Sequence, residues 1–527
     1  MPFQSELNAL DRFFAETLLK GTAFQNEEMS LALQKLMQDA REGHLCVFED
    51  DVKPIRRLPS SIVGDGDSLF PKTPIVRFEN RYYLQKNWVY ETYLLQNIHR
   101  LWEKKPPSYY DLSLFEKELS LIPALSASQI NVLKAILTRS FFVIHGGPGT
   151  GKTYTAGHLA KLLYNSLKKD EKKHFRISAA APTGKAAACL RASLLAQMPK
   201  SSNLQIEAVT LHRLLRLQPG ENRLFSHRKI DADLILVDEA SMIDIELFAH
   251  LLESVGDETI LILLGDPDQL PPVEAGSCFA EVATLFGMRL EECMRTEERP
   301  LQELSLSIKE GNVERFFQLL DSSRPNLVFQ EEIPSVDILY QRQGPPLSLD
   351  PKQGLQESTR FRILNAMRQG KVGSDRINQS ILYLLQNHKR TWAAPILSIL
   401  NDPFSQLYNG MGGILIGQKE AFFPDPFSNE IRAFSPPSPY ELAFCLSIHK
   451  SQGSEFEEIF ALFPEGSDSF GREALYTAVT RAKKRIEIRG DRDLLQSMLA
   501  KTSRKRNGFL ARNWKEFLWQ RQFNVRK

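Results

Sequence analysis

Several features that would define other classes of protein are missing from this sequence. Its five cysteines are widely scattered and include no CxxC pair, so neither a disulfide framework nor a zinc site is expected. No run of about 18 apolar residues occurs and no apolar leader opens the chain, so neither a membrane span nor a secretory signal is predicted. The formal net charge is only +2, so any nucleic-acid site must be local.

The sequence has instead the composition of a globular protein with several domains. It is 42% hydrophobic and 25% charged, and its 527 residues are too many for one ordinary core. Residues 1–120 are expected to form an N-terminal domain. Helical periodicity covers Leu7–Leu19 and Glu28–Glu42, and strand patterns cover His44–Phe48 and Pro74–Leu84. This domain is therefore predicted to be mainly helical.

The pattern changes over residues 121–290, where short apolar runs alternate with helical stretches. The runs are Phe141–Ile144, Ile177–Ala181, Leu234–Val237 and Ile260–Leu264. This alternation is typical of a parallel sheet covered by helices. A second α/β region is expected over 291–395 and 443–500, interrupted at 396–442 by Gly- and Pro-rich sequence with short strands. Residues 322–358 are expected to be loop.

A glycine-rich motif of the form G-x-x-x-x-G-K-[ST] follows the first apolar run. It consists of Gly146, Gly147, Pro148, Gly149, Thr150, Gly151, Lys152 and Thr153. A strand before it and a helical run after it are the context that a phosphate-binding loop requires. Backbone amides there converge on phosphate oxygens. Lys152 is expected to reach the β- and γ-phosphates of ATP, and the Thr153 hydroxyl to ligate Mg²⁺.

A second motif follows the run Leu234–Val237. Asp238 and Glu239 end this strand at the carboxyl edge of the predicted sheet, where open α/β folds bind ligands. Asp238 is expected to hold Mg²⁺ through water, and Glu239 to orient and polarise the attacking water. The two motifs together predict an ATP-hydrolysing site.

Six further motifs separate this chain from other ATPases. They are Ala181–Ala187, Thr210–Leu215, Gly265–Pro272, Cys293–Thr296, Ser447–Phe456 and Leu475–Ala482. Small residues and hydroxyl groups in the first two suit contacts with nucleic-acid phosphates that do not read bases. Gln269, after the strand Ile260–Leu264, is placed to sense the γ-phosphate. These motifs predict a motor that moves along single-stranded nucleic acid.

In this order the motifs resemble those of superfamily 1 helicases. The runs GGPGTGKT, APTGKAAA, TLHRLL, LVDEASM, GDPDQLPPVEAG, HKSQGSEF and YTAVTRAKKR are similar to the RecD family, the helicase subunits of RecBCD-type enzymes. Gly43–Cys46 and Pro74–Lys86 look like the N-terminal domain of that family. Leu407–Gly410 looks like the start of its SH3-like insertion. The resemblance implies an α/β fold with two RecA-like domains, a mainly helical N-terminal domain and a small SH3-like β insertion.

The resemblance also assigns roles to particular residues. The catalytic set would be Lys152, Glu239, Gln269, Arg295 and Arg481, with the two arginines reaching the γ-phosphate across the cleft. Gln129 would recognise adenine, and Glu455 would lie near the nucleotide. The nucleic-acid contacts would come from Pro182, Thr183, Gly184, Thr210, His212, Ser447, His449 and Gln452. Residues 501–527 form a basic C-terminal tail that is expected to be a solvated or docking segment, with backbone binding of nucleic acid as the alternative.

Plainer interpretations stand beside several of these roles. Arg295 and Arg481 would otherwise be surface ion-pair residues, Gln129 a helix-surface residue, and His212 and His449 core histidines. Residues 216–230 are either the family's strand-separating β-hairpin or an ordinary surface hairpin.

The function implied is a 5′-to-3′ DNA helicase subunit for double-strand-break repair and recombination in the cytoplasm. Its cofactors would be ATP and Mg²⁺, and its partners single-stranded and duplex-end DNA with a nuclease-helicase subunit and a scaffold subunit. No nuclease constellation is seen outside the ATP motifs. Three departures from the family pattern are Ser447 for Thr, Met411 for Asp and Leu400 for a basic residue, and the last two put the DNA contacts of the insertion in question.

Three alternatives remain. A free-standing helicase of the same branch usually carries N-terminal helix-hairpin-helix repeats, which are not seen. A non-motor scaffold has no need for intact Lys152, Asp238, Glu239, Gln269 and Arg481. A relative that acts on RNA is not excluded by phosphate contacts alone.

Overall fold

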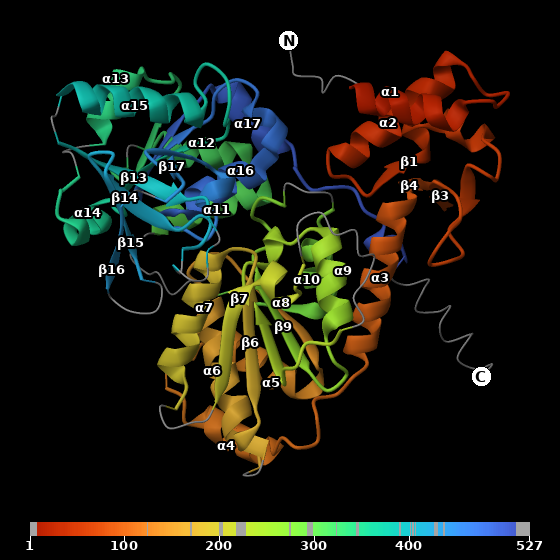
Figure 1. Ribbon diagram of the computed structural model, residues 1–527, viewed down its shortest axis with the longest axis horizontal. Helices are drawn as coiled ribbons and strands as arrows, with labels where there is room; N and C mark the ends of the chain where they lie inside the picture. Colours follow the sequence, from red (N-terminus) through yellow and green to blue (C-terminus); the bar gives the residue numbers. More distant parts are fainter. Residues whose placement is uncertain are drawn as a thin grey trace.

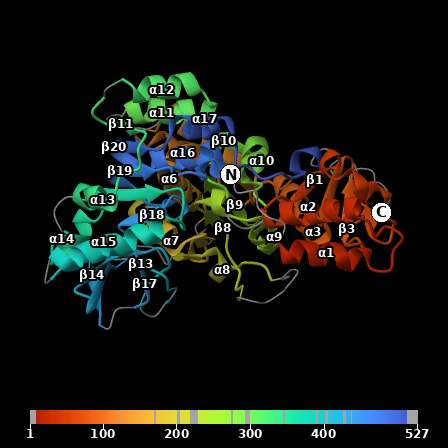
Figure 2. The same cartoon turned by 90° about the horizontal axis from the view of Figure 1, so that it is seen from above.

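The computed structural model describes residues 8–512, except 124, 169–170, 200–203, 218–227, 273–275, 292–298, 323, 344–346, 389–390, 401, 403–404, 406, 426–429 and 436–437. Two α/β domains lie next to each other, and a small N-terminal domain lies beside the first of them (Figures 1 and 2). Among the helices of these ranges, none has the length and apolar character that crossing a bilayer requires.

The first α/β domain is built on a six-stranded parallel sheet with the order β10-β5-β9-β8-β6-β7. Its strands are β5 (Phe141–His145), β6 (Arg176–Ala181), β7 (Gln205–Thr210), β8 (Leu234–Val237), β9 (Ile260–Gly265) and β10 (Gly287–Arg289). Its helices are α4 (Leu112–Ser120), α5 (Ala127–Ala135), α6 (Lys152–Asn165), α7 (Gly184–Gln197), α8 (Leu211–Leu214), α9 (Ile245–Ser254) and α10 (Phe279–Phe286). All four predicted strands of residues 121–290 are confirmed.

Helices cover both faces of this sheet, which explains why its strands are apolar throughout. Phe141 and Val143 point into a core shared with α9 and α10, whereas Phe142 and Ile144 point into a core shared with α5 and α6. Successive strand residues face opposite sides, so a strand buried on both faces has no polar alternation.

The second α/β domain has a five-stranded parallel sheet with the order β11-β20-β19-β12-β18. Its strands are β11 (Leu327–Gln330), β12 (Phe361–Asn365), β18 (Cys445–Ser447), β19 (Phe456–Leu462) and β20 (Ala482–Arg489). Its helices are α11 (Arg299–Glu310), α12 (Val313–Leu320), α13 (Val336–Arg342), α15 (Ser374–His388), α16 (Gly471–Thr480) and α17 (Arg492–Ala500). The two parallel sheets are typical of a pair of RecA-like domains.

The prediction of loop for residues 322–358 is wrong. This interval contributes β11 and α13, and it also contains α14 (Pro351–Glu357). Pro351 occupies the first turn of α14, after Asp350, whose side chain accepts a hydrogen bond from the Gln353 amide. Proline at this position starts a helix, because its missing N–H has no partner there in any case.

The insertion is an antiparallel sheet with the order β16-β15-β14-β13-β17. Its strands are β13 (Ala393–Ser398), β14 (Gly412–Ile416), β15 (Glu420–Pro424), β16 (Ile431–Phe434) and β17 (Tyr440–Leu442). It shares a core with α15 and β12, so it is attached to the second α/β domain.

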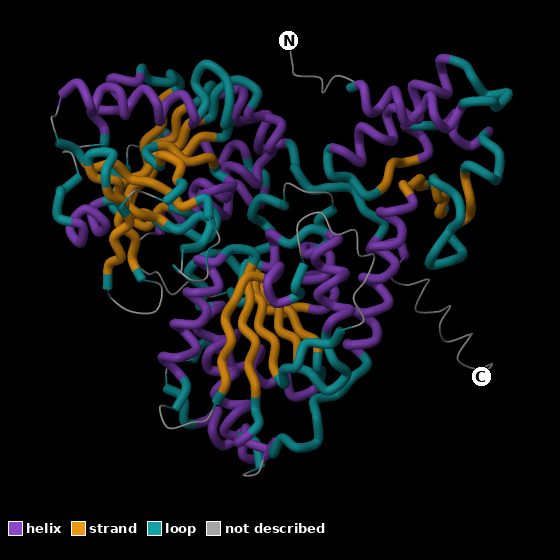
Figure 3. The backbone as a smooth tube through the Cα atoms, in the orientation of Figure 1, coloured by secondary structure: helices purple, strands orange, loops and turns teal. Residues whose placement is uncertain are grey.

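The N-terminal domain combines helices with a small sheet of order β1-β4-β3-β2. Its elements are α1 (Ala9–Leu19), α2 (Glu27–Arg41), β1 (Cys46–Phe48), β2 (Val63–Asp65), β3 (Ile75–Phe78) and β4 (Arg81–Leu84). The next helix, α3 (Gln85–Trp102), runs along the first α/β domain beside α9 (Figure 3). Leu94, Leu95 and Ile98 are fully buried in the core of that domain, so α3 joins the two.

Candidate functional site

The glycine-rich loop lies between β5 and α6, as its motif predicts. Gly149 (φ 78°) and Gly151 (φ 80°) adopt left-handed backbone that only glycine takes without strain. Lys152 begins α6, and its Nζ donates hydrogen bonds to the carbonyl oxygens of Gly146 (2.8 Å) and Gly147 (3.1 Å). The ammonium group is therefore held inside the loop, at the N-terminus of a helix, where phosphate oxygens are favoured.

Thr153 and Asp238 meet at the edge of the same sheet. The Thr153 hydroxyl donates to Asp238 Oδ2 at 3.0 Å, and the Glu239 amide donates to Asp238 Oδ1 at 2.8 Å. A hydroxyl and a carboxylate are hard oxygen donors of the kind that Mg²⁺ takes beside phosphate oxygens and water. These two side chains consequently fit a magnesium ion bound with a nucleotide.

Glu239 is held in an unusual conformation. Its φ of 52° lies in the left-handed region, which costs a non-glycine residue about 1–3 kcal/mol and is most often tolerated at functional sites. Burial raises the pKa of Glu239, the neighbouring Asp238 raises it further, and the charge of Arg481 lowers it. Burial also raises the pKa of Asp238. Arg481 belongs to the second α/β domain, so a charge from that domain acts on Glu239.

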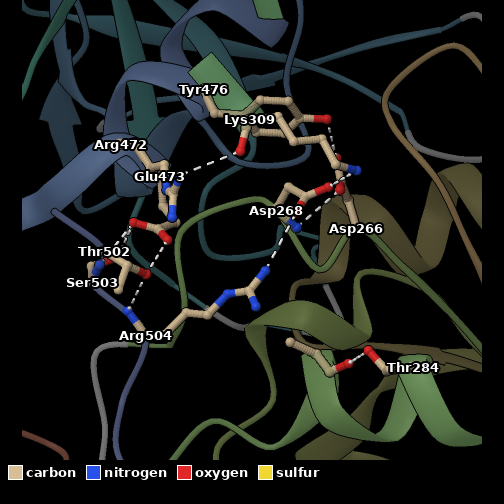
Figure 4. A network of polar contacts seen from close by, with 11 residues as sticks. Asp266, Asp268, Thr284, Lys309, Arg472, Glu473, Tyr476, Thr502, Ser503 and Arg504 are labelled. Atoms are coloured by element: carbon tan, nitrogen blue, oxygen red, sulfur yellow. Dashed lines mark hydrogen bonds and ion pairs between the residues drawn. The ribbon is translucent and has the colours of Figure 1, made fainter. Parts of the chain in front are cut away.

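The loop after β9 connects the two α/β domains. The hydroxyl of Tyr476, on α16, donates to Asp266 Oδ2 at 3.1 Å (Figure 4). Gln269 Nε2 donates to the same oxygen at 3.2 Å, and the Leu270 amide donates to Thr477 Oγ1 at 3.0 Å. Gln269 is buried, and its Oε1 has no hydrogen-bond partner within the described part of the chain. That oxygen is available to a ligand bound beside this loop.

Gln129 is not the helix-surface residue of the plainer interpretation. It is 1% exposed, caps α5 together with Ser126, and donates from Nε2 to Thr155 Oγ1 at 3.2 Å. A Cβ built on Gly151 would lie 2.9 Å from the same Nε2. Gln129 therefore lies against the glycine-rich loop, and its side-chain hydrogen bonds hold that loop and α5 together.

The other residues predicted to act on the nucleotide are Arg481, Glu455 and Arg295. Arg481 is 3% exposed and donates from Nη1 to the carbonyl oxygen of Ser454 at 3.3 Å, so it is not a surface ion-pair residue. Glu455 forms an ion pair with Lys483 at 3.6 Å, and its charge also acts on Lys185. Arg295 lies outside the described residues. Most of the segment 216–230 does so too, which leaves its hairpin untested.

A cleft of about 520 Å³ is lined in part by Pro271 and Pro272, which follow the loop after β9. Seven of the eight predicted nucleic-acid residues line it: Pro182, Thr183, Gly184, Thr210, His212, His449 and Gln452. The eighth, Ser447, lines a neighbouring cavity of about 240 Å³ together with Arg368 and Lys450. His212 is exposed, which rules out a core histidine, whereas His449 is half-buried against the ring of Phe470.

The sequence alone assigns no role to Lys185, which lines this cleft, or to Tyr408, which lies beside it. Lys185 Nζ donates to Ser454 Oγ at 2.7 Å, which joins the two α/β domains. Tyr408 of the insertion packs on Gly184 so closely that a Cβ built there would lie 2.3 Å from its Cβ. The motif APTGKAAA contains Lys185, but only the folded chain brings it to Ser454 and brings Tyr408 to Gly184.

Comparisons with known proteins identify the families to which the chain is similar. Residues 124–324 match the AAA domain family, and residues 442–486 match the UvrD-like helicase C-terminal domain. The chain is similar to the RecBCD enzyme subunit RecD of Mycolicibacterium smegmatis, with 30% identity over 93% of this chain and 94% of that protein. The same subunit of Haemophilus influenzae is 29% identical over 70% of this chain and 69% of that protein.

Two further relatives are more distant. The ATP-dependent RecD2 DNA helicase of Deinococcus radiodurans is 26% identical over 73% of this chain and 51% of that protein. A solved structure of Pif1 helicase from Bacteroides, in complex with ADP-AlF3 and ssDNA, is 18% identical with a TM-score of 0.45 over 77% of this chain and 98% of that chain. On the near-complete match to the Mycolicibacterium protein, the chain belongs to the RecD family of superfamily 1 DNA helicases, the subunits of RecBCD enzymes.

Proposed function

We propose that this chain is the ATP-driven motor that moves 5′ to 3′ along one DNA strand within a RecBCD-type helicase–nuclease. It would work in the cytoplasm on duplex ends during double-strand-break repair and recombination. Its partners would be a nuclease-helicase subunit and a scaffold subunit, since no nuclease site is seen in its own sequence.

One observation carries this proposal. Gln269, which borders the ATP cleft, is followed directly by Leu270, whose carbonyl oxygen accepts a hydrogen bond of 3.0 Å from Gln452 Nε2. Gln452 lines the second cleft, and Thr477 holds the Leu270 amide. Only one residue, Leu270, therefore separates Gln269 from Gln452, one of the residues proposed to hold DNA. A movement of Gln269 in the ATP site would reach the DNA site through it.

The roles of the site residues follow from this arrangement. Lys152 would hold the β- and γ-phosphates, and Thr153 and Asp238 would hold Mg²⁺, which would screen phosphate charge. Glu239 would accept a hydrogen bond from the attacking water, and Arg481 would stabilise charge on the γ-phosphate. Arg295 would assist Arg481, Glu455 would lie near the nucleotide, and Gln129 would contact adenine. Loss of the γ-phosphate would release Gln269 and loosen the grip of Gln452.

The N-terminal domain is the proposed docking surface for partner subunits. Three apolar side chains are exposed on its helices: Leu10 (51%) and Phe13 (65%) on α1, and Leu31 (48%) on α2. Leu10 and Phe13 are three residues apart and so share one face of α1, and exposed apolar groups that lie together mark protein interaction sites. The insertion, proposed to be SH3-like, would cover the DNA strand from the side of Asn409 and Gly410.

The test is the ATPase rate with and without single-stranded DNA. Lys152→Gln and Glu239→Gln should each abolish DNA-stimulated hydrolysis, whereas the exposed controls Lys134→Gln and Glu258→Gln should not change it. Duplexes with a 5′ tail should be unwound and those with a 3′ tail should not. Stimulation by RNA of the same sequence would indicate an RNA-acting motor. A wild-type chain that stays inactive with co-purified partner subunits would refute the proposal.

A further inference from the structure

The last described residues form a segment that touches three parts of the molecule. We call residues 502–512 the C-terminal strap. It leaves α17 of the second α/β domain and crosses to the N-terminal domain (Figure 1). The sequence predicts a solvated or docking segment here, and the structure shows docking: Phe509 and Arg512 are fully buried.

The first anchor of the strap is Glu473 on α16. This buried carboxylate accepts hydrogen bonds from Thr502 Oγ1 (2.5 Å), the Ser503 amide (2.8 Å) and Ser503 Oγ (3.1 Å). One turn further along α16, Tyr476 contacts Asp266, and the helix ends at Arg481. The strap therefore starts on the helix that carries the second domain's contribution to the ATP cleft.

The strap next passes the loop that carries Gln269. Arg504 Nη2 lies 3.4 Å from Asp268 Oδ1, and Lys309 also forms an ion pair with Asp268 (Figure 4). The Asp268 amide in turn donates to Asp266 Oδ1 at 3.2 Å. Arg504 thus holds the residue directly before Gln269, although its own side chain is 53% exposed.

The far anchor lies on the N-terminal domain and on α3, the helix that joins it to the first α/β domain. The Arg506 backbone pairs with the Gly43–Cys46 turn: its amide donates to His44 Nδ1 (2.8 Å) and its carbonyl oxygen accepts from the Leu45 amide (2.8 Å). Arg512 Nη1 bonds Glu91 Oε2 at 2.7 Å, with both side chains fully buried, and its guanidinium lies 3.6 Å from the ring centre of Trp88. A buried ion pair is costly to break, so this end is fixed.

We propose that Arg504 is a positioning residue for ATP hydrolysis, and that the C-terminal strap transmits the position of the N-terminal domain to the loop Asp266–Leu270. The strap is also held on the first α/β domain, by the burial of Phe509 in its core and by a 3.1 Å hydrogen bond from Asn507 Nδ2 to the Ser277 carbonyl oxygen. The stretch between Glu473 and Arg506 therefore allows the loop to move only if α16 or the N-terminal turn that holds Arg506 moves as well. A partner that binds the N-terminal domain would in this way set the hydrolysis rate. This inference rests on the proposed function, because it concerns the same ATP site.

The experiment compares Arg504→Met with Arg504→Lys in the full chain. Arg57→Met is the matched control, because Arg57 forms an exposed ion pair with Glu28 at the same 3.4 Å. Arg504→Met should lower the DNA-stimulated kcat by about two- to fivefold, the range that an exposed ion pair supports, with little change in the KM for ATP. Arg504→Lys should restore the rate, and Arg57→Met should leave it unchanged.

Hydrogen exchange supplies a second readout that needs no activity. Amides of residues 268–270 should exchange faster in Arg504→Met, and also in Arg512→Met, which releases the far anchor. If both act through one strap, the double variant should exchange no faster than the more affected single variant. Additive effects would overturn the link to the N-terminal domain, and exchange equal to that of Arg57→Met would overturn the role of Arg504. An inactive wild type with the expected exchange would refute the proposed function alone.

Discussion

The hydrogen bond between Tyr476 and Asp266 offers the sharpest test of how the two α/β domains are held together. Both groups are buried, and the 3.1 Å bond crosses the interface beside the glycine-rich loop. A Cβ built on Gly147 would lie 3.2 Å from the Tyr476 hydroxyl oxygen, so this hydroxyl also touches the loop. The substitution Tyr476→Phe removes one oxygen atom and leaves the ring packing intact.

The size of the effect follows from the partner. A hydrogen bond to a charged group contributes about 1.5–3 kcal/mol, and leaving a buried acceptor short of a donor costs a similar amount. Asp266 keeps its contact with Gln269 Nε2, which places the expected loss near the lower end, at about 1.5 kcal/mol. If only the closed arrangement hydrolyses ATP, kcat/KM for ATP should fall about tenfold.

The assay is steady-state ATP hydrolysis at saturating single-stranded DNA, with Tyr82→Phe as the control. The Tyr82 hydroxyl is also buried but has no hydrogen-bond partner among the described residues, so its removal should change nothing. A Tyr476→Phe variant whose kcat/KM equals that of Tyr82→Phe would show that this bond does not hold the catalytic arrangement.

Three further predictions concern other parts of the molecule. Because burial raises the pKa of Glu239 and the base must be ionised, kcat should fall with decreasing pH at a midpoint above the ordinary glutamate value of about 4.3, and a constant kcat down to about pH 5 would contradict this. A raised pKa also means that the folded state binds the proton of Glu239 more tightly than the unfolded state does. Ionised Glu239 therefore lowers the free energy of unfolding near neutral pH. Glu91→Gln leaves Arg512 buried without its charge partner and should lower the free energy of unfolding by about 3–5 kcal/mol in urea titrations, against less than about 1 kcal/mol for the exposed Glu28→Gln. Gly184→Ala should displace Tyr408 and weaken single-stranded DNA binding about tenfold in a fluorescence titration, whereas Gly412→Ala, which has open space around it, should not.

The sequence predicted the two parallel sheets because both faces of each sheet are apolar. It located Lys152, Thr153, Asp238 and Glu239 because local spacing alone defines their motifs. Contacts between residues far apart in the sequence have no such signal. No local pattern predicts that Lys185 contacts Ser454 or that Tyr408 packs on Gly184. The loop prediction for residues 322–358 was wrong because a composition rich in Pro, Gln and Ser without a clear period does not exclude helices, and Pro351 lies in the first turn of one.

The plainer interpretation of Gln129 as a helix-surface residue was wrong for a related reason. Its capping role with Ser126 is visible in the sequence as a Ser and a Gln three residues apart, which is a capping signature. Burial against Gly151 depends on the packing of α5 on α6, which periodicity does not reveal.

The buried pair of Glu91 and Arg512 has a consequence for the order in which the chain is made. Both hydrogen bonds that Glu91 accepts in the described structure come from residues more than 400 positions later, Gly508 and Arg512. During synthesis the N-terminal domain leaves the ribosome first, yet its buried carboxylate stays uncompensated until almost the whole protein has been translated. The first domain to emerge is therefore among the last to reach its final stability. A chain that stops before residue 508 lacks both hydrogen bonds to Glu91, so its N-terminal domain is not completed.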